Sequence, residues 1–247
     1  MSDTDLSIDE IENEQNMPNW NTTDVILISL AILLFFFLAA FGLNFTADSN
    51  NVSDFTVWTS TLLASLEGIV LIGSVYIVGL RRRGWNWEHV GLIKPSSYWL
   101  SVSIVIGIFA IPVSAIIAVG IQLALGRPIE NTQLTFLAPN GFTWFSAISM
   151  FILGGLIAPV AEELYFRGVL FHWLNSKWTI WPSILLSALV FGLVHGEASV
   201  AGAAFVLGIF MAWVYYKSSS LWTAIIVHAI NNSVKILLLY VFLGLSI

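Results

Sequence analysis

The chain has 247 residues, of which 57% are hydrophobic and 10% are charged, and its mean hydropathy is +0.86. Soluble domains carry about 25% charged residues. This composition therefore excludes a soluble domain and indicates a polytopic membrane protein. We expect the lipid bilayer as its surroundings and no nucleic-acid partner. The sequence contains no cysteine, which excludes disulfides, thiolate metal ligands and a cysteine nucleophile.

The net charge of −6 has its main source at the N-terminal end. Residues 1–23 contain no basic residue, and the acidic residues of the first 24 positions are Asp3, Asp5, Asp9, Glu10, Glu12, Glu14 and Asp24. Such a segment cannot bury enough apolar surface to fold alone, so we predict an acidic, flexible, solvated tail. A cleavable secretion signal is not expected, because it would begin with basic residues and continue directly into an apolar core.

Seven charge-poor stretches follow, each near the roughly 20 residues that a spanning helix needs, although the last ones are short. Only helices satisfy their own backbone in lipid without closing into a barrel, so we predict an all-α polytopic membrane helix bundle with seven to eight transmembrane helices. The predicted spans are 25–45, 55–80, 99–125, 144–161, 178–195, 198–216 and 221–234. Residues 236–247 are apolar but too short to cross alone, so they form an eighth span or extend the seventh helix.

Basic residues near span ends favour the cytoplasmic side, and residues 81–83 are three arginines between the second and third spans. This places the N-terminus in the cytoplasm of a multi-pass protein, which we assign to the cell membrane. The irregular stretch 126–142 divides N-terminal transmembrane helices (24–126) from a C-terminal core (144–247). Most of the buried-looking polar residues belong to this second half.

Two adjacent carboxylates, Glu162 and Glu163, lie between apolar runs of the predicted core. Charge at bilayer depth costs about 3 kcal/mol per residue on insertion scales, so it is rare and functional by default. Glu163 and Arg167 are four residues apart and can pair on one helix face, whereas Glu162 is turned roughly 100° away. Glu162 is then the candidate general base, Arg167 is structural, and Pro159 just upstream predicts a kink or a freed carbonyl.

The same four-residue spacing joins Phe191 to His195 and His228 to Asn232, so each pair shares a helix face. A lone buried histidine is more often a hydrogen-bonded core residue than a catalyst. Buried polar groups on three helices nevertheless need partners, and a common cluster is the economical arrangement. Glu162, His195 and His228 suit either a zinc site with an open water position or a water held by protein groups alone, and composition does not choose between them.

Taken in order, Glu162-Glu163-x-x-x-Arg167, Phe191-x-x-x-His195 and His228-x-x-x-Asn232 resemble the CAAX-processing and bacteriocin-immunity (CPBP) family of intramembrane endopeptidases, which includes the type II CAAX prenyl proteases. The resemblance implies hydrolysis of a peptide bond in a membrane-associated, prenylated or unprenylated protein. It implies that Glu162 activates water with help from His195, while His228 and Asn232 bind metal or stabilise the oxyanion. Glu163 belongs to the catalytic motif, Arg167 and Phe191 support it, and zinc on Glu162, His195 and His228 is the implied cofactor.

Other polar residues have simpler interpretations: Glu67 as a snorkelling or helix-paired acid, His172 and Glu197 as interfacial, and the arginines 81–83 as a membrane-surface anchor. Two other functions remain open. A transporter would also place acids and histidines at mid-membrane, but it would usually show two repeated halves, which are not visible here. A non-catalytic scaffold or immunity protein of the same fold would be expected to lack Glu162, His195 or His228.

Overall fold

The computed structural model describes residues 20–46, 57–130, 133, 137–138 and 141–245, with the side chains of 43–46 excepted. In this part of the chain every regular element is helical, which confirms the all-α bundle. Within these described ranges, six helical segments are long and apolar enough to cross a membrane: Thr22–Gly42, Val57–Arg81, Ser97–Ala124, Trp144–Asn175, Ala198–Ser218 and Leu221–Leu245.

The helices have the following bounds: α2 Thr22–Thr46, α3 Val57–Ser74, η2 Val75–Arg81, η3 Trp87–Val90, α4 Ser97–Ala124, α6 Trp144–Ile152, η4 Leu153–Ile157, α7 Ala158–Tyr165, η5 Phe166–Phe171, α8 His172–Asn175, α9 Ile180–Leu193, α10 Ala198–Ser218 and α11 Leu221–Leu245. Elements α6 to α8 form one continuous segment with π-helical turns at η4 and η5. The two glutamates therefore lie inside a long helix.

Helix α9 differs most from its predicted span, 178–195. It has 14 residues, so at about 1.5 Å per residue it rises roughly 21 Å and does not cross a hydrocarbon core of about 30 Å. The helix ends at Leu193, and Gly196 takes a left-handed φ of 72° in the turn that follows. His195 is in this turn instead of on a spanning helix. Helix α11, by contrast, runs unbroken to Leu245, so the last apolar stretch extends the seventh helix.

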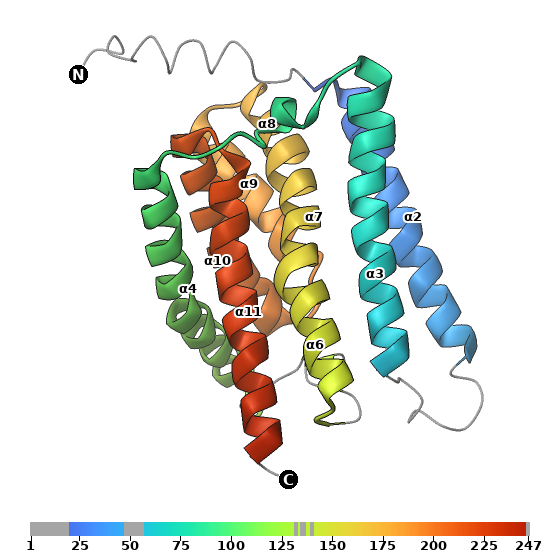
Figure 1. The fold of residues 1–247 in the computed structure, drawn as a ribbon, viewed down its shortest axis with the longest axis vertical. Coiled ribbons are helices and arrows are strands. Elements are labelled where there is room, and N and C mark those ends of the chain that lie inside the picture. The colour runs from blue at the N-terminus through green and yellow to red at the C-terminus, as the bar shows by residue number, and fades with distance from the viewer. Residues whose placement is uncertain (1–19, 47–56, 131–132, 134–136, 139–140, 246–247) are drawn as a thin grey trace.

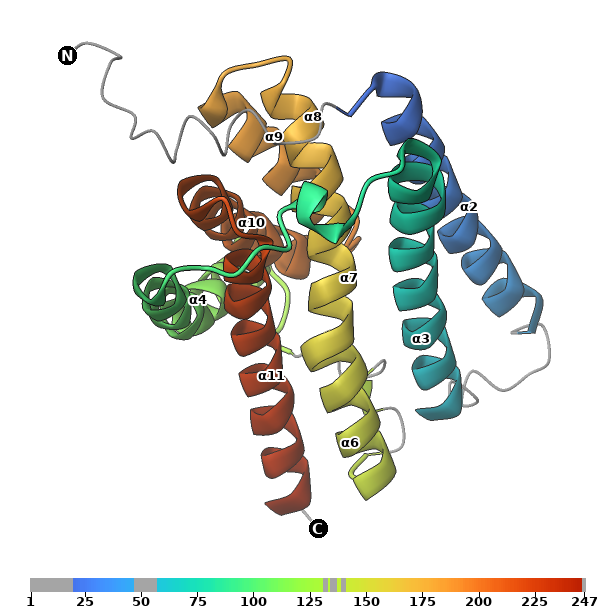
Figure 2. The same ribbon diagram turned by 45° about the horizontal axis from the view of Figure 1, so that its top comes forward.

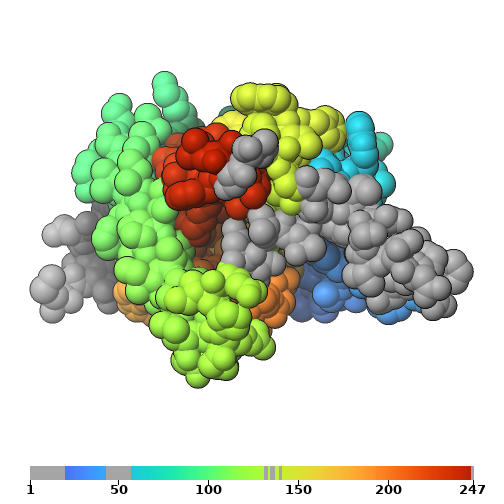
Figure 3. Space-filling model, turned by 90° about the horizontal axis from the view of Figure 1, so that it is seen from below, coloured from blue at the N-terminus to red at the C-terminus, as the bar shows by residue number. Residues whose placement is uncertain are grey.

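The helices form a C-terminal bundle with an N-terminal pair beside it. Figure 1 shows α7 and α11 near the centre, with α4 and α10 on one side and α3 and α2 on the other. Figure 2, turned toward the top, keeps α3 beside α7 and α2 outside α3. From the opposite end, Figure 3 shows the end of α11 (red) between α4 (green) and α6 (yellow). The pair α2–α3 therefore reaches the bundle through α7.

Part of the predicted acidic tail is ordered. Residues 1–19 lie outside the described residues, but Trp20 is 1% exposed and donates from Nε1 to the carbonyl of Gly168, at 2.8 Å. Asp24 is fully buried and pairs with Arg82 (Nη2 to Oδ1, 2.8 Å) and Arg83 (Nε to Oδ2, 2.6 Å). Its charge therefore belongs to an ion-pair cluster, and two of the three arginines bind a carboxylate in addition to any contact with lipid.

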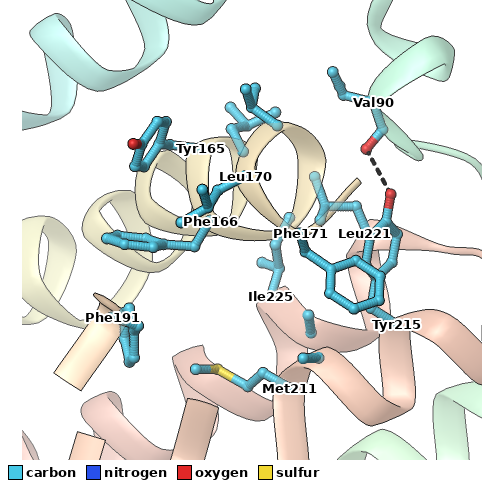
Figure 4. Close-up of a cluster of buried hydrophobic side chains, with 14 of the residues drawn as sticks. Val90, Tyr165, Phe166, Leu170, Phe171, Phe191, Met211, Tyr215, Leu221 and Ile225 are labelled. Carbon is cyan, nitrogen blue, oxygen red and sulfur yellow. Dashed lines mark hydrogen bonds between the residues drawn. The ribbon is translucent and has the colours of Figure 1, made fainter. Parts of the chain in front are cut away.

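The connection between α3 and α4 is fixed to the helices of the core. In Figure 4 the Tyr215 hydroxyl donates to the carbonyl of Val90, at 3.3 Å. Gly91 follows with a φ of 83°, and a Cβ there would stand 2.6 Å from the Tyr215 oxygen. His172 also hydrogen-bonds the Tyr215 hydroxyl, a contact that the interfacial interpretation did not include. These contacts close the end of the bundle where α10 finishes.

Small residues let α10 approach its neighbours closely, as the run Gly202, Ala203, Ala204, Gly208 and Ala212 predicts. A Cβ on Gly202 would stand 2.1 Å from Ile121 of α4, and one on Gly208 would stand 3.0 Å from Ala188 of α9. At Gly208 the lack of a side chain also leaves the backbone carbonyl accessible to Arg167, a buried residue of the polar site.

Candidate active site

A continuous polar network links α7, η5, α10 and α11, and Glu163 is at its centre. Its Oε1 accepts from Arg167 Nη1 at 2.9 Å, as the four-residue spacing predicted, and also faces His228 Nδ1 at 2.9 Å. Glu163 and Arg167 are fully buried and His228 is 2% exposed. A buried carboxylate needs such compensation, because an unpaired charge in a low-dielectric interior is strongly unfavourable.

The contacts of His228 define its tautomer. A carboxylate only accepts, so Nδ1 carries the proton that is donated to Glu163, and Nε2 is left as an acceptor. Nε2 receives a hydrogen bond from Asn232 Nδ2 at 3.2 Å, one turn further along α11. The second hydrogen of the Asn232 amide goes to the carbonyl of Gly154, also at 3.2 Å. The imidazole is therefore held from both ends.

The η4 turn explains how Asn232 reaches this position. Pro159 has no N–H to donate to the carbonyl of Gly155, four residues earlier, and that carbonyl accepts instead from Ser233 Oγ at 3.1 Å. The neighbouring carbonyl of Gly154 accepts from Asn232. The freed carbonyl expected from Pro159 is thus present, and two glycines in a π-helical turn bring α11 against it. Such π-helical insertions are frequent at functional sites.

Glu162 has the contrasting environment. Its Oε2 is buried and forms no hydrogen bond with any described residue, and it lies 3.9 Å from His228 Nε2. This separation exceeds a direct hydrogen bond, and a polar gap of this size suits a bridging water. The adjacent glutamates are therefore differentiated as the sequence predicted: Glu163 is neutralised by Arg167, and Glu162 is left free.

Phe191 packs among the charged and aromatic groups of the site. Its ring makes edge contacts with His195 (centroids 4.9 Å apart) and His228 (5.5 Å), and the Arg167 guanidinium lies 4.6 Å from its centroid. Figure 4 shows Phe166 facing Phe191 from the neighbouring helix. The two predicted support residues, Phe191 and Arg167, thus contact each other, and Arg167 Nη2 also donates to the carbonyl of Gly208 at 3.0 Å.

His195 is near the cluster without being hydrogen-bonded to it. Its Nδ1 lies 2.8 Å from the carbonyl of Phe191, which requires a proton on Nδ1 and leaves Nε2 as an acceptor. The residue is half-buried and sits in the turn after α9. Because α9 is short, this turn is not carried to the far membrane surface, and the Phe191 ring connects His195 to His228.

The network extends to residues that the sequence patterns did not single out. Asn231 Nδ2 donates to Asn232 Oδ1 at 3.2 Å, and the Asn231 carbonyl oxygen Oδ1 lies 3.2 Å from Ser114 Oγ of α4. Asn231 directly precedes the motif asparagine, and the adjacent amides were the available signal. Glu197, predicted to be interfacial, caps α10 by accepting from the backbone N–H groups of Ser199 and Val200.

The predicted zinc ligands have suitable donor atoms but not a ligand geometry. Among the described residues no three His, Asp or Glu side chains are close enough to hold one ion. Glu162 and His228 approach each other, whereas His195 reaches the site only through Phe191. As placed, the three residues do not fit a zinc ion. Zinc therefore stays an expectation of the family resemblance.

A surface depression of about 630 Å³ lies elsewhere, between α8 and α9. None of the polar-network residues contributes to it, and its lining consists of Asn175, Ser176, Lys177, Trp178, Thr179, Pro182 and Leu186.

Comparisons with known proteins cover the region of this site. Residues 143–234 match the family model described as type II CAAX prenyl endopeptidase Rce1-like. The chain is 23% identical over 192 residues, which are 77% of this chain and 75% of the relative, to a Bacillus subtilis (strain 168) protein named "Putative membrane peptidase YdiL". No solved structure matches the chain significantly.

The fold and these matches define the class as an α-helical, multi-pass membrane protein, and they support a membrane protease in general. The matched segment contains all three motifs and the polar network that they form. The resemblance to CPBP-family proteases that those motifs predicted is confirmed over residues 143–234.

Proposed function

We propose that the chain is an intramembrane endopeptidase that hydrolyses a peptide bond of a membrane-associated protein, with Glu162 as the base that activates water. One observation carries this proposal. Glu162 Oε2 is buried and without a hydrogen-bond partner among the described residues, and it faces His228 Nε2 at 3.9 Å. A general base needs this kind of free, positioned carboxylate beside a place for water.

In the proposed reaction a water bound between Glu162 and His228 gives a proton to Glu162 Oε2, and its oxygen bonds to the carbonyl carbon of the substrate. His228 Nε2, which carries no proton, accepts the second hydrogen of the water. Asn232 Nδ2, which donates to His228 in the resting site, donates instead to the substrate carbonyl oxygen as that oxygen becomes negative, and so acts as an oxyanion donor. Glu163 and Arg167 act through His228 as positioning residues.

The substrate is proposed from the family description. The matched model is described as a type II CAAX prenyl endopeptidase, so a protein with a lipid-modified C-terminal segment is the first substrate class to test. The site lies on long apolar helices, which suits a substrate that is already bound to the bilayer.

We also propose a cytoplasmic N-terminus in the cell membrane. The start of α2 and the end of η2 share one end of the bundle, because Asp24 pairs with Arg82 and Arg83. Clustered arginines at a span end favour the cytoplasmic side. Since the chain has no cysteine, Ser176→Cys provides a single label site. In intact cells a membrane-impermeant maleimide should not label it, and labelling should require permeabilisation of the membrane.

The function is tested with the purified protein in lipid vesicles and a quenched-fluorescence peptide that ends in a farnesylated CAAX sequence. Glu162→Gln keeps the shape but removes the base, so turnover should fall by at least about 10²-fold while the protein stays folded. Glu88→Gln, an exposed acid on η3, is the matched control and should cleave normally. Undiminished cleavage by Glu162→Gln would overturn the proposal.

A further inference from the structure

We propose that Glu67 of α3 is a further catalytic residue, whose carboxyl group protonates the leaving amine. This inference rests on the proposed function and adds a residue from outside the matched segment 143–234. The sequence patterns suggested only a snorkelling or helix-paired acid for Glu67, but its position in the fold gives it a more specific role.

Glu67 belongs to the face of α3 that points into the bundle. Its neighbours on that face are Ser60, Leu71 and Ser74, which are 0%, 3% and 8% exposed. Residues at spacings of seven, four and three lie on one side of a helix, so the Glu67 side chain starts from this buried stripe. Snorkelling toward the membrane surface, in contrast, would be expected from the lipid-facing side of α3.

The neighbour of this face is the helix that carries Glu162. Figures 1 and 2 both show α3 beside α7. Gly68, adjacent to Glu67, is so close to η4 that an added Cβ would stand 3.2 Å from Ile157 Cγ2. Ile157 lies five residues before Glu162 on the same continuous helical segment, so the carboxyls of α3 and α7 approach one side of the site.

The charges agree with this placement. Glu67 is close enough to Glu162 for the charges of their carboxyl groups to interact. Arg167 forms its salt bridge with Glu163, and within the described chain Glu67 has neither a salt bridge nor a hydrogen bond. His228, the remaining charged or titratable contact of Glu162, is engaged by Glu163. Glu67 is therefore a membrane-embedded acid beside the proposed base with no structural partner to explain it.

Peptide hydrolysis requires a proton on the departing nitrogen, and Glu67 is placed to donate it. In the first step the water proton passes to Glu162, and the water oxygen forms the bond to carbon. In the second step the C–N bond breaks, its electron pair stays on nitrogen, and nitrogen takes the proton of the Glu67 carboxyl. The proton on Glu162 then returns to Glu67 through a second water, and both groups regain their starting states.

The experiment separates proton donation from structural support by changing the leaving group. The farnesylated CAAX peptide is compared with an aryl ester of the same acyl segment, whose phenolate leaves without a proton. Glu67→Gln should lower the kcat for the peptide by at least about 10²-fold and leave ester hydrolysis near the wild-type rate. Glu67→Asp, which keeps the acid, should recover part of the peptide activity, and Glu88→Gln should match wild type on both substrates.

Each other outcome contradicts the inference. An equal loss on peptide and ester would make Glu67 a structural or positioning residue, and an unchanged peptide rate would remove it from the site. Loss of the folded, monodisperse protein in both Glu67 variants would show a stability role. The proposed function fails separately, if the wild-type protein cleaves neither substrate or if Glu162→Gln cleaves both.

Discussion

The imidazole Nδ1 of His228 lies 2.9 Å from Glu163 Oε1, and this hydrogen bond joins the last helix of the chain to the helix of the paired glutamates. The same oxygen holds Arg167. Of two adjacent carboxylates, one is therefore fully used in fixing a histidine and an arginine, and the other is kept available. This division of roles requires both helices and explains why Glu162 and Glu163 are not interchangeable.

The first prediction concerns Glu163. Glu163→Ala leaves the buried Arg167 without its partner, so the free energy of unfolding should fall by about 3–5 kcal/mol. The double variant Glu163→Leu/Arg167→Met replaces both charges by apolar groups and should be more stable than the single variant. Neither should cleave peptide efficiently, because His228 loses its acceptor. Denaturant titration in detergent measures stability, and a double variant as unstable as the single one would contradict this account.

The second prediction concerns Asn232. Asn232→Leu removes the hydrogen bonds to His228 and Gly154 and the proposed oxyanion donor, so kcat should fall by about 10²–10³-fold. Asn231→Ala is the neighbouring control. Its amide reaches His228 only through Asn232, and a much smaller loss of kcat is expected. Steady-state cleavage of the vesicle-bound peptide measures kcat for each variant. Equal losses in the two variants would assign Asn232 a structural role.

Local spacing predicted much of this site, because residues four apart on a helix share a face wherever that helix lies. The pairing of Glu163 with Arg167 and the contact of His228 with Asn232 follow from that rule. The position of Glu67 does not, because it depends on how α3 packs against α7, a contact between distant parts of the chain.

Tertiary contacts likewise changed the interpretation of the N-terminal region. Trp20 and Asp24 follow an acidic stretch and seemed to belong to a solvated tail. Both are buried, because Gly168 and the arginines that follow η2 provide their partners. The length of α9 was also set by the turn around Gly196, whereas hydropathy alone carried the predicted span to His195.

The third prediction tests the cofactor implied by the family resemblance. Because Glu162, His195 and His228 as placed do not fit a zinc ion, the purified protein should cleave the peptide without stoichiometric zinc, and a chelator should leave the cleavage rate unchanged. Metal analysis and cleavage assays before and after chelation measure this. His89→Ala removes a histidine of the connection between α3 and α4 and serves as the control. Bound zinc that His228→Ala lowers together with activity, with no change in His89→Ala, would contradict this prediction and support the cofactor of the family resemblance.

The fourth prediction concerns the close contact between η4 and α11. A Cβ on Gly155 would stand 2.8 Å from Ser233 Oγ and 3.4 Å from the backbone Cα of Ser233, so Gly155→Ala must move the Ser233 hydroxyl and press on the α11 backbone. It should lower the free energy of unfolding by about 1–3 kcal/mol and lower kcat, because Asn232 moves with its helix. Gly154→Ala is the milder control, since its Cβ would meet only the flexible end of Ile236, at 3.2 Å.

Ser233→Ala tests the same contact from the other side. Alone it should cost about 1 kcal/mol through the lost hydrogen bond to the carbonyl of Gly155. Combined with Gly155→Ala, it removes the atom that the new methyl group meets, so the double variant should be destabilised by less than the sum of the single variants. Denaturant unfolding of the four proteins measures this coupling. Strict additivity would mean that the methyl group is accommodated without moving α11, and the predicted loss of activity would then have no structural basis.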